Sequence, residues 1–193
     1  MKLAIIKYNA GNIRSVTFAL ERVGVHALVT DDAAEISSAD KVIFPGVGEA
    51  SSAMKYLKER NLDTLITSLK QPVLGICLGM QLMCQYSQEG NTPCLGIFDQ
   101  QVKKFDSNMK IPQIGWNRIS NLKSTLFQGV NEGEYMYFVH GYYAELGKYT
   151  ISTTDYDNLY SSALRKGNFY ATQFHPEKSS IAGQRILENF VNM

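Results

Sequence analysis

The chain has 193 residues, of which 45% are hydrophobic, with 19 basic and 18 acidic side chains and a formal net charge of +1. A charge this close to zero gives no overall field that would attract nucleic acid or an anionic membrane. Its three cysteines are too few for a disulfide framework, and their spacing matches no metal-binding pattern. We therefore expect one domain spanning residues 1–193, with no metal, nucleic-acid or membrane partner.

The first half of the chain alternates between strand-length apolar runs and stretches with helical spacing. Helical spacing recurs over residues 12–23 and 50–70, the second stretch with a break near Asn61. Strand-like runs cover residues 3–8, 27–30 and 41–44, and another starts at Val73. This alternation predicts a parallel sheet with helices on its faces.

Beyond Gly96 the pattern changes to short strands. We expect these at 101–105, 114–119, 136–139, 149–154, 161–165 and 169–174, followed by a closing helix at 181–192. We see no linker between the halves, so the predicted fold is α/β, a single domain with a mostly parallel central sheet and a strand-rich second half. The first apolar run is too short for a signal peptide, and no run approaches the roughly 20 residues that span a bilayer. We therefore expect a cytoplasmic protein.

Cys77 lies where a strand-like run turns into a helical pattern, between Gly75 and Gly79. A nucleophile on a sharp strand-to-helix turn is exposed beside backbone N–H groups. The amino-terminal end of the following helix would also favour the thiolate form of the cysteine. A buried structural cysteine at a tight turn would give the same local pattern. Cys84, two helical turns further on, is expected in the core.

His175 and Glu177 follow the last predicted strand and are separated only by Pro176. A cysteine nucleophile needs a base, and the base needs a third group that fixes its tautomer. A proline between the two would hold them in a fixed mutual geometry. Together with Cys77 they indicate a catalytic Cys-His-Glu set. We interpret His140, which lacks such an acidic partner, as structural or interfacial, and His26 as a surface loop residue.

Two segments, 75–81 and 175–180, resemble those of the class I, or triad, glutamine amidotransferases. Further segments at 45–48, 115–117 and 137–140 are similar to that family and follow its order, so the resemblance covers the chain from first strand to last helix. It implies a flavodoxin-like fold and hydrolysis of glutamine to glutamate and ammonia. The reaction would pass through a thioester on Cys77, with His175 as base, Glu177 as its orienting acid and no cofactor.

The resemblance also implies roles for residues around this set. The segment Pro45-Gly46-Val47-Gly48 and the residue Leu78 would supply backbone N–H donors to the oxyanion, and Gln81 would bind glutamine. From the residues alone, the first would be a plain Pro-Gly turn and Gln81 a solvent-exposed side chain. Positions that would face a partner subunit are Asn12, Trp116, Asn117, Tyr137 and Lys178, although a lone tryptophan is also an ordinary core residue.

Within the family, the motifs are most similar to the glutaminase subunits of histidine biosynthesis, which pass ammonia to a (β/α)₈-barrel cyclase subunit in a heterodimer. The chain has no glycine-rich phosphate loop with its lysine, so the cyclase site would lie on another chain. Three alternatives stay open: a triad glutaminase serving anthranilate or pyridoxal phosphate synthesis, a cysteine peptidase of similar fold, and a non-catalytic binding module. The first should lack the 115–117 motif, and the second has no need of Gln81 together with segment 45–48.

Two stretches depart from the family pattern. Residues 7–12 read Lys-Tyr-Asn-Ala-Gly-Asn where an Asp-Tyr-Gly-x-Gly-Asn opening is usual, and Gly141 stands where Ser or Thr is usual. Neither change touches Cys77, His175 or Glu177, so they put local contacts in doubt and not the chemistry.

Overall fold

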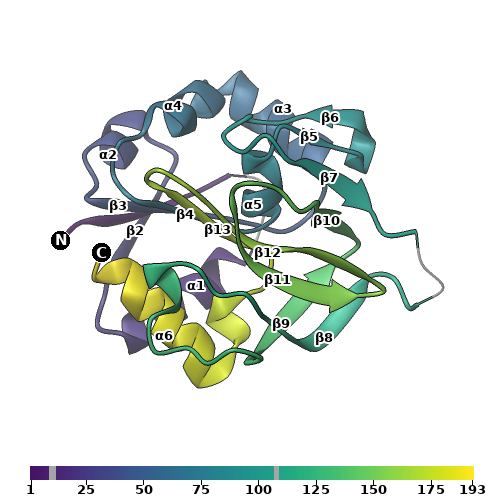
Figure 1. Ribbon diagram of the computed structural model, residues 1–193. Helices are drawn as coiled ribbons and strands as arrows, with labels where there is room; N and C mark the ends of the chain where they lie inside the picture. The colour runs from purple at the N-terminus through teal and green to yellow at the C-terminus, as the bar shows by residue number, and fades with distance from the viewer. Residues whose placement is uncertain (9–11, 107–108) are drawn as a thin grey trace.

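A computed structural model describes residues 1–8, 12–106 and 109–193. Its main feature is an 11-stranded sheet in the order β2-β1-β3-β4-β13-β12-β10-β7-β5-β6, with β11 beside β12 (Figure 1). Strands β2, β1, β3, β4 and β13 form a parallel block, and β13 pairs antiparallel with β12. The predicted α/β class, with a parallel centre and a strand-rich second half, is confirmed.

The strands of this sheet are β1 (Leu3–Ile6), β2 (Ala27–Thr30), β3 (Lys41–Gly46), β4 (Val73–Cys77), β5 (Tyr86–Ser87), β6 (Thr92–Pro93), β7 (Gln101–Lys104), β10 (Tyr142–Ala144), β11 (Thr150–Tyr156), β12 (Asn158–Lys166) and β13 (Phe169–Thr172).

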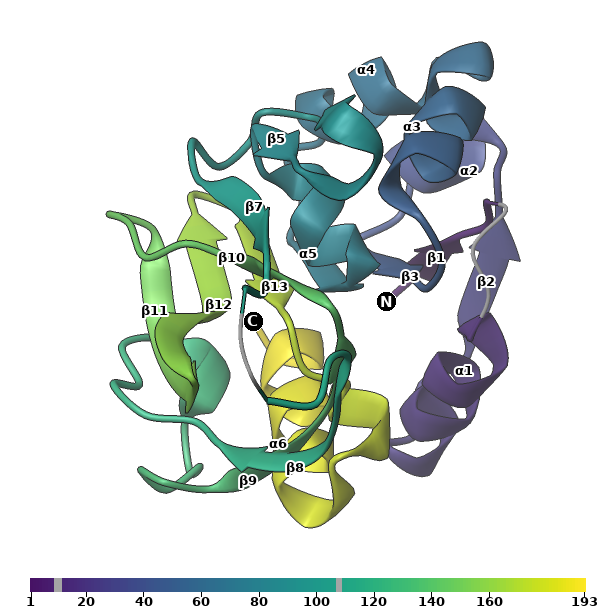
Figure 2. The same cartoon turned by 90° about the vertical axis from the view of Figure 1, so that its right-hand side faces the viewer.

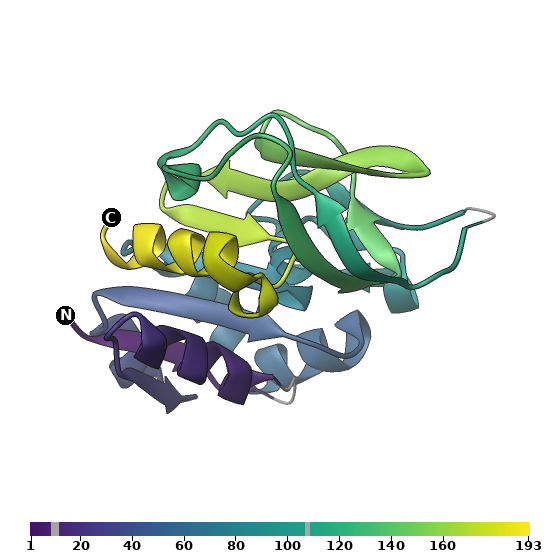
Figure 3. The same cartoon turned by 90° about the horizontal axis from the view of Figure 1, so that it is seen from below.

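Helices cover both faces of the parallel block. One face carries α2 (Ala33–Ser37), α3 (Ala50–Glu59), α4 (Leu62–Ser68) and α5 (Leu78–Met83), and the other carries α1 (Ile13–Arg22) and α6 (Ser180–Val191) (Figures 1 and 3). In β1, Ala4 and Ile6 belong to one buried cluster, whereas Leu3 and Ile5 belong to the other. Because helices cover both faces of the sheet, the residues of β1 that point to either face are apolar, and the strand is an unbroken apolar run in the sequence. In the described parts of the chain, no helix is long and apolar enough to cross a membrane.

A separate antiparallel pair, β8 (Gln113–Arg118) and β9 (Tyr135–His140), lies beside α6 (Figure 2). It is tied to the segment that follows β13, because the main-chain nitrogen of His175 donates to the carbonyl oxygen of Tyr137 at 2.9 Å. Three short 3₁₀ turns complete the described structure: η1 (Glu89–Asn91), η2 (Thr125–Phe127) and η3 (Pro176–Lys178).

Most predicted elements are found within a few residues of their expected bounds, and the helical stretch does break at Asn61, whose φ is 56°. The predicted end of the strand at residue 44 is wrong, because β3 continues through Pro45 and pairs Gly46 with Cys77. The strand predicted for 169–174 ends earlier, at Thr172. The sequence predicted neither the short strand β10 nor the short helix α2, since three to five residues carry too little periodicity to be recognised.

Candidate functional site

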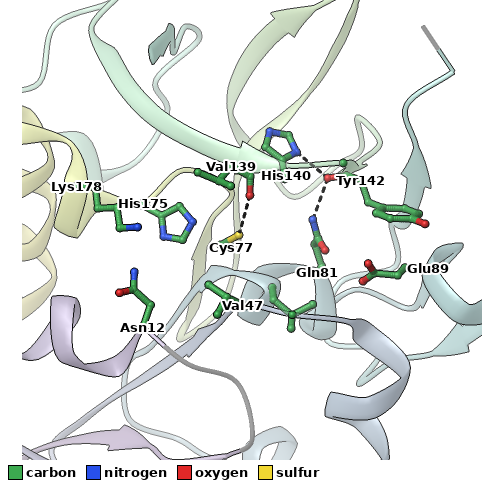
Figure 4. A pocket seen from close by; sticks show the side chains of 13 residues that line it. Asn12, Val47, Cys77, Gln81, Glu89, Val139, His140, Tyr142, His175 and Lys178 are labelled. Carbon is green, nitrogen blue, oxygen red and sulfur yellow. Dashed lines mark hydrogen bonds between the residues drawn. The ribbon is translucent and has the colours of Figure 1, made fainter. Parts of the chain in front are cut away.

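The carboxyl ends of β3, β4 and β13 meet at one edge of the sheet. The register pairs Gly46 with Cys77, and Ile76 with Thr172, so the residues after Thr172 emerge next to Cys77. This is the edge at which open α/β sheets bind ligands. A cavity of about 360 Å³ opens there, within the usual size of a small-molecule site. Its lining includes Asn12, Val47, Gly48, Cys77, Leu78, Gln81, Glu89, His140, His175 and Lys178 (Figure 4).

Cys77 stands at the predicted sharp turn between β4 and α5. Its backbone has φ 54° and ψ −109°, a conformation that non-glycine residues rarely adopt and that costs about 1–3 kcal/mol. Close packing of α5 against β3 stabilises this turn. A Cβ at Gly79 would lie only 1.9 Å from the carbonyl oxygen of Phe44. Only glycine permits this approach, and it presents the Cys77 side chain to the cavity.

His175 and Glu177 form a buried pair, with Nδ1 of the imidazole 2.8 Å from Oε1 of the carboxylate. Their side chains are 3% and 1% exposed. The turn η3 begins at Pro176, where the fixed φ of proline suits the first helical position. The Ser179 hydroxyl, just after η3, donates to the carbonyl oxygen of His175 at 2.6 Å and stabilises the C-terminal end of the turn. The predicted His-Pro-Glu geometry is therefore present.

The electrostatics of this pair involve Cys77. Burial lowers the pKa of His175, but the charge of the Cys77 sulfur and a hydrogen bond to it, followed by Glu177, raise the pKa to about 10. Near neutral pH the imidazole is thus protonated beside the sulfur. An imidazolium at this position can give its proton to a leaving group of a bound molecule.

Asn12 contributes to the same cluster. Its Nδ2 donates to Oε1 of Glu177 at 3.1 Å, so that oxygen accepts from both Asn12 and His175. The other carboxylate oxygen, Oε2, has no hydrogen-bond partner among the described residues. From the sequence, Asn12 was expected only at a partner interface. The rest of its loop, Asn9-Ala10-Gly11, lies outside the described residues.

Two glutamines, Gln81 and Gln173, also lie near Cys77. Nε2 of Gln81 donates to the carbonyl oxygen of Tyr142 at 2.9 Å and to Oε1 of Gln173 at 3.0 Å. Nε2 of Gln173 in turn lies 3.8 Å from the Cys77 sulfur. Gln81 therefore lines the cavity, and its amide nitrogen already donates to two groups of the chain, while its binding of glutamine stays a prediction. Gln173 was missed, although it lies two residues before His175, the spacing that puts two side chains on one side of a strand.

The family model for glutamine amidotransferase class-I matches residues 5–193. The chain belongs to the class I glutamine amidotransferases. This amidotransferase is 59% identical over 196 residues to imidazole glycerol phosphate synthase subunit HisH of Bacteroides fragilis, with 100% of each chain covered. It is 43% identical to the protein of that name from Vibrio vulnificus, covering 100% of this chain and 98% of the other.

Solved structures agree at the level of the fold. A crystal structure of a glutamine amidotransferase superimposes with a TM-score of 0.76 at 17% sequence identity, over 98% of this chain and 97% of the other. At such low identity the likeness shows the fold alone. The amidotransferase fold predicted from the motifs is thereby confirmed.

Glu89 of the amidotransferase lines the cavity on the side away from His175 (Figure 4). Its Oε2 accepts from the main-chain nitrogen of Ala50, the first residue of α3, at 2.9 Å. Burial raises the pKa of Glu89, the Ala50 N–H lowers it and Glu49 raises it further, with a net upward shift. The carboxylate is placed to meet a positively charged group. No sequence signal marked it, because a lone glutamate in a Ser-Gln-Glu-Gly segment is ordinarily a surface residue.

His140 also lines the cavity of the amidotransferase, but both its ring nitrogens are engaged. Nδ1 donates to the carbonyl oxygen of Tyr142 at 2.7 Å, and Nε2 lies 3.2 Å from the Tyr160 hydroxyl. Burial lowers the pKa of His140 to about 4, the bond to Tyr142 opposes this and His175 adds to it. A neutral, fully bonded imidazole fits the structural role predicted for it. His26 is exposed, as expected.

Four of the five residues predicted to face a partner lie on β8, β9 and η3, and the fifth, Asn12, directly precedes α1. Trp116 is 52% exposed, so the alternative of a core tryptophan is wrong. Its ring stands 5.9 Å from that of Tyr137, and Nζ of Lys178 lies over the same tyrosine ring at 5.9 Å. The side chain of Asn117 donates instead to the carbonyl oxygen of Asp155 at 2.9 Å. Aromatic exposure of this kind, on the His175 side of the cavity, fits a protein interface.

The departure at Gly141 has no steric cause. A Cβ built there would meet Ile111 and Pro112 only at ordinary contact distances of 3.7 and 3.9 Å. The amidotransferase therefore has room for a Cβ at this position.

Proposed function

We propose that this amidotransferase is the glutaminase subunit of imidazole glycerol phosphate synthase, a cytoplasmic enzyme of one domain. The observation that carries the proposal is the buried His175–Glu177 pair, at 2.8 Å, whose imidazole interacts with the sulfur of Cys77 at the ligand-binding edge of the sheet. Full-length relatives bearing that name at 59% and 43% identity support the histidine branch over anthranilate or pyridoxal phosphate synthesis.

The reaction begins with attack of the Cys77 thiolate on the carboxamide carbon of glutamine. The carbon–nitrogen bond breaks as His175 gives its proton to the leaving ammonia, and a thioester remains on Cys77. His175, held by Glu177, then takes a proton from water as the water oxygen attacks the thioester. Glutamate leaves, and the proton on His175 and the thiolate on Cys77 are restored. No metal or organic cofactor enters these steps.

The tetrahedral intermediates of both steps carry a negative oxygen. The turn Gly46-Val47-Gly48 and Leu78 lie beside Cys77, and we assign their backbone N–H groups as the donors to this oxygen. At the other end of the cavity, the carboxylate of Glu89 and Oε1 of Gln81 can accept hydrogen bonds from the α-ammonium group of glutamine. The substrate would thus lie with its carboxamide at Cys77 and its amino-acid end at Glu89.

The ammonia passes to a (β/α)₈-barrel cyclase subunit, which makes imidazole glycerol phosphate and an aminoimidazole carboxamide ribotide. The surface around Trp116, Tyr137 and Lys178 is the interface we assign to that subunit, with Asn12 at its edge. Because η3 carries both Glu177 and Lys178, the interface adjoins the catalytic residues.

Replacing the nucleophile tests the proposal. In the complex with the cyclase subunit, Cys77→Ala should abolish synthesis from glutamine and leave synthesis from ammonium salts intact, because only ammonia generation is lost. Cys94→Ala, at a half-buried cysteine away from the cavity, is the matched control and should keep both activities. Loss of both activities in Cys77→Ala would mean that Cys77 is structural. Retained glutamine hydrolysis would remove it from the mechanism.

A further inference from the structure

Tyr8 carries a buried hydroxyl that has no hydrogen-bond partner in the described parts of the chain. The residue is 5% exposed, and its ring packs against Phe44 with centroids 5.2 Å apart. An unpartnered buried hydroxyl destabilises the folded state, and phenylalanine would fill the same space without that cost. Such a group calls for an explanation outside the resting structure.

The hydroxyl lies at the junction of β3 and α5. A Cβ built on Gly46 would stand 2.0 Å from the Tyr8 oxygen and 3.0 Å from Cβ of Leu78, so hydroxyl and helix start converge on the Gly46 backbone. The hydroxyl therefore adjoins both segments to which the proposed function assigns the oxyanion donors. Burial raises the pKa of Tyr8, and the charge of Cys77 raises it further, so the hydroxyl stays protonated and can donate.

The turn beside it has room to adjust. Gly48 has φ +111°, and no atom lies within 4 Å of the position a Cβ would take there. Val47 is 37% exposed at the cavity. A peptide unit is planar, with its N–H and C=O directed oppositely, so an N–H turned toward the substrate sends the adjoining carbonyl into the protein. A buried carbonyl needs a donor, and the Tyr8 hydroxyl is an unpartnered one at that place.

We propose that Tyr8 is a positioning residue of glutamine hydrolysis. As the oxyanion forms at Cys77, the Tyr8 hydroxyl donates to a main-chain carbonyl of the turn Gly46–Gly48 and so holds a backbone N–H toward the substrate oxygen. The inference rests on the proposed function, because it assumes an oxyanion at Cys77. The unpartnered hydroxyl thus destabilises the resting structure and gains its partner in the reacting state.

The test is Tyr8→Phe in the complex with the cyclase subunit, with kcat and KM for glutamine and the thermal midpoint Tm measured together. We expect kcat to fall tenfold or more, KM to stay within twofold and Tm to stay level or rise. Loss of an oxyanion donor costs on the order of 10²–10³ in rate, and loss of its support should cost less. An interaction made only in the transition state lowers kcat without raising KM.

Two other tyrosines serve as controls. The Tyr160 hydroxyl donates to Oε1 of Gln113 at 2.9 Å, so Tyr160→Phe should lower Tm where Tyr8→Phe does not. The Tyr56 hydroxyl lies 3.5 Å from Asp31 on the surface, and Tyr56→Phe should change neither kcat nor Tm.

A double-mutant cycle with Gly46→Ala tests the placement itself. The added methyl group meets the Tyr8 hydroxyl, so Gly46→Ala alone should lower Tm, and Tyr8→Phe in the same chain should restore part of the loss. The restoration should be incomplete, because Cβ of Leu78 and the Tyr8 ring carbon still lie 3.0 and 3.2 Å away.

The outcomes separate the inference from the proposed function. A parent complex that fails to hydrolyse glutamine refutes the proposed function. An active parent with unchanged kcat in Tyr8→Phe overturns the inference alone. A fall of Tm and kcat together would make Tyr8 a structural residue, and a rise of KM alone would make it a substrate contact. Either result overturns the positioning role.

Discussion

Glu177 offers only one of its oxygens to hydrogen bonds. Oε1 accepts from His175 and Asn12, while Oε2 has no partner in the described structure. Glu177→Gln can keep both contacts to Oε1, so the free energy of unfolding should change by only about 1 kcal/mol. Glutamine turnover should fall by orders of magnitude, because a neutral amide no longer stabilises the imidazolium. Steady-state kinetics and denaturant unfolding measure the two effects.

Glu59→Gln is the matched control, since that side chain is 55% exposed on α3. It should leave turnover and stability unchanged. Near-normal turnover of Glu177→Gln would place the orienting acid elsewhere or make it dispensable.

Gln173 contacts the nucleophile itself. Its Nε2 lies 3.8 Å from the Cys77 sulfur, a long contact to a group that becomes a thiolate. A hydrogen bond to a charged group contributes about 1.5–3 kcal/mol, and a contact this long belongs at the low end, so Gln173→Leu should lower kcat by about tenfold. The same variant should slow alkylation of Cys77 by iodoacetamide at pH 7. Gln184→Leu on α6 is the control, and unchanged alkylation in Gln173→Leu would contradict the contact.

The residues predicted from sequence are those whose geometry is fixed by nearby chain. His175 and Glu177 are separated by one proline, and Cys77 is held by its own turn, so short motifs carry their roles. The contact between Gln173 and Cys77 joins residues 96 positions apart, and Glu89 reaches the cavity only because η1 docks on the start of α3. Such placements depend on tertiary packing, which no local pattern records.

Helices and strands, too, divide into those that local sequence predicts and those that depend on tertiary packing. The strands of the parallel block were predicted because both their faces are buried and their sequences are continuously apolar. The end of β3 was not, because proline is usually excluded from central strands. Here Pro45 lies one residue before the end of β3 and pairs with Ile76, so the strand loses a single donor where it is about to leave the sheet. That extension brings Gly46 level with Cys77.

The end of β9 carries an element-scale prediction on pH. The pKa of His140 is lowered to about 4, so between pH 6.5 and 4 the unfolded chain binds a proton that the folded chain does not. The stability that depends on neutral His140 is therefore present above pH 6.5 and lost as pH falls toward 4, by about 3 kcal/mol in all. Denaturant unfolding of the parent and of His140→Gln across this range measures it. The difference between them should shrink as pH falls, and parallel curves would contradict the prediction.

His175 does not confuse this measurement. Its pKa is raised to about 10, so the stability linked to it is fully present below pH 6.5 and is lost as pH rises toward 10. The two histidines thus act in separate pH windows. Asp and Glu carboxylates contribute equally to both proteins and cancel in the comparison.

At the scale of the whole molecule, the proposed interface and the catalytic residues share one structural unit. The main chain of Tyr137 accepts from the His175 nitrogen at 2.9 Å and donates to the Ser179 hydroxyl at 2.9 Å. The turn η3 holds Glu177 and Lys178 side by side. A subunit bound to Trp116, Tyr137 and Lys178 would therefore contact the same elements, β9 and η3, that position His175.

This arrangement predicts that the isolated chain hydrolyses glutamine slowly and that the cyclase subunit accelerates it. A small change in the turn Gly46–Gly48 would be enough to control the rate, because one missing oxyanion donor costs on the order of 10²–10³ in rate. Gly48 leaves this turn room to move. We expect turnover to rise from the isolated chain to the complex, and again when the complex binds a ribotide ligand. Lys178→Met should reduce the activation while leaving the slow activity of the isolated chain unchanged. Equal rates in all three states would refute the coupling between the proposed interface and the catalytic residues. An isolated chain as fast as the liganded complex would refute it too.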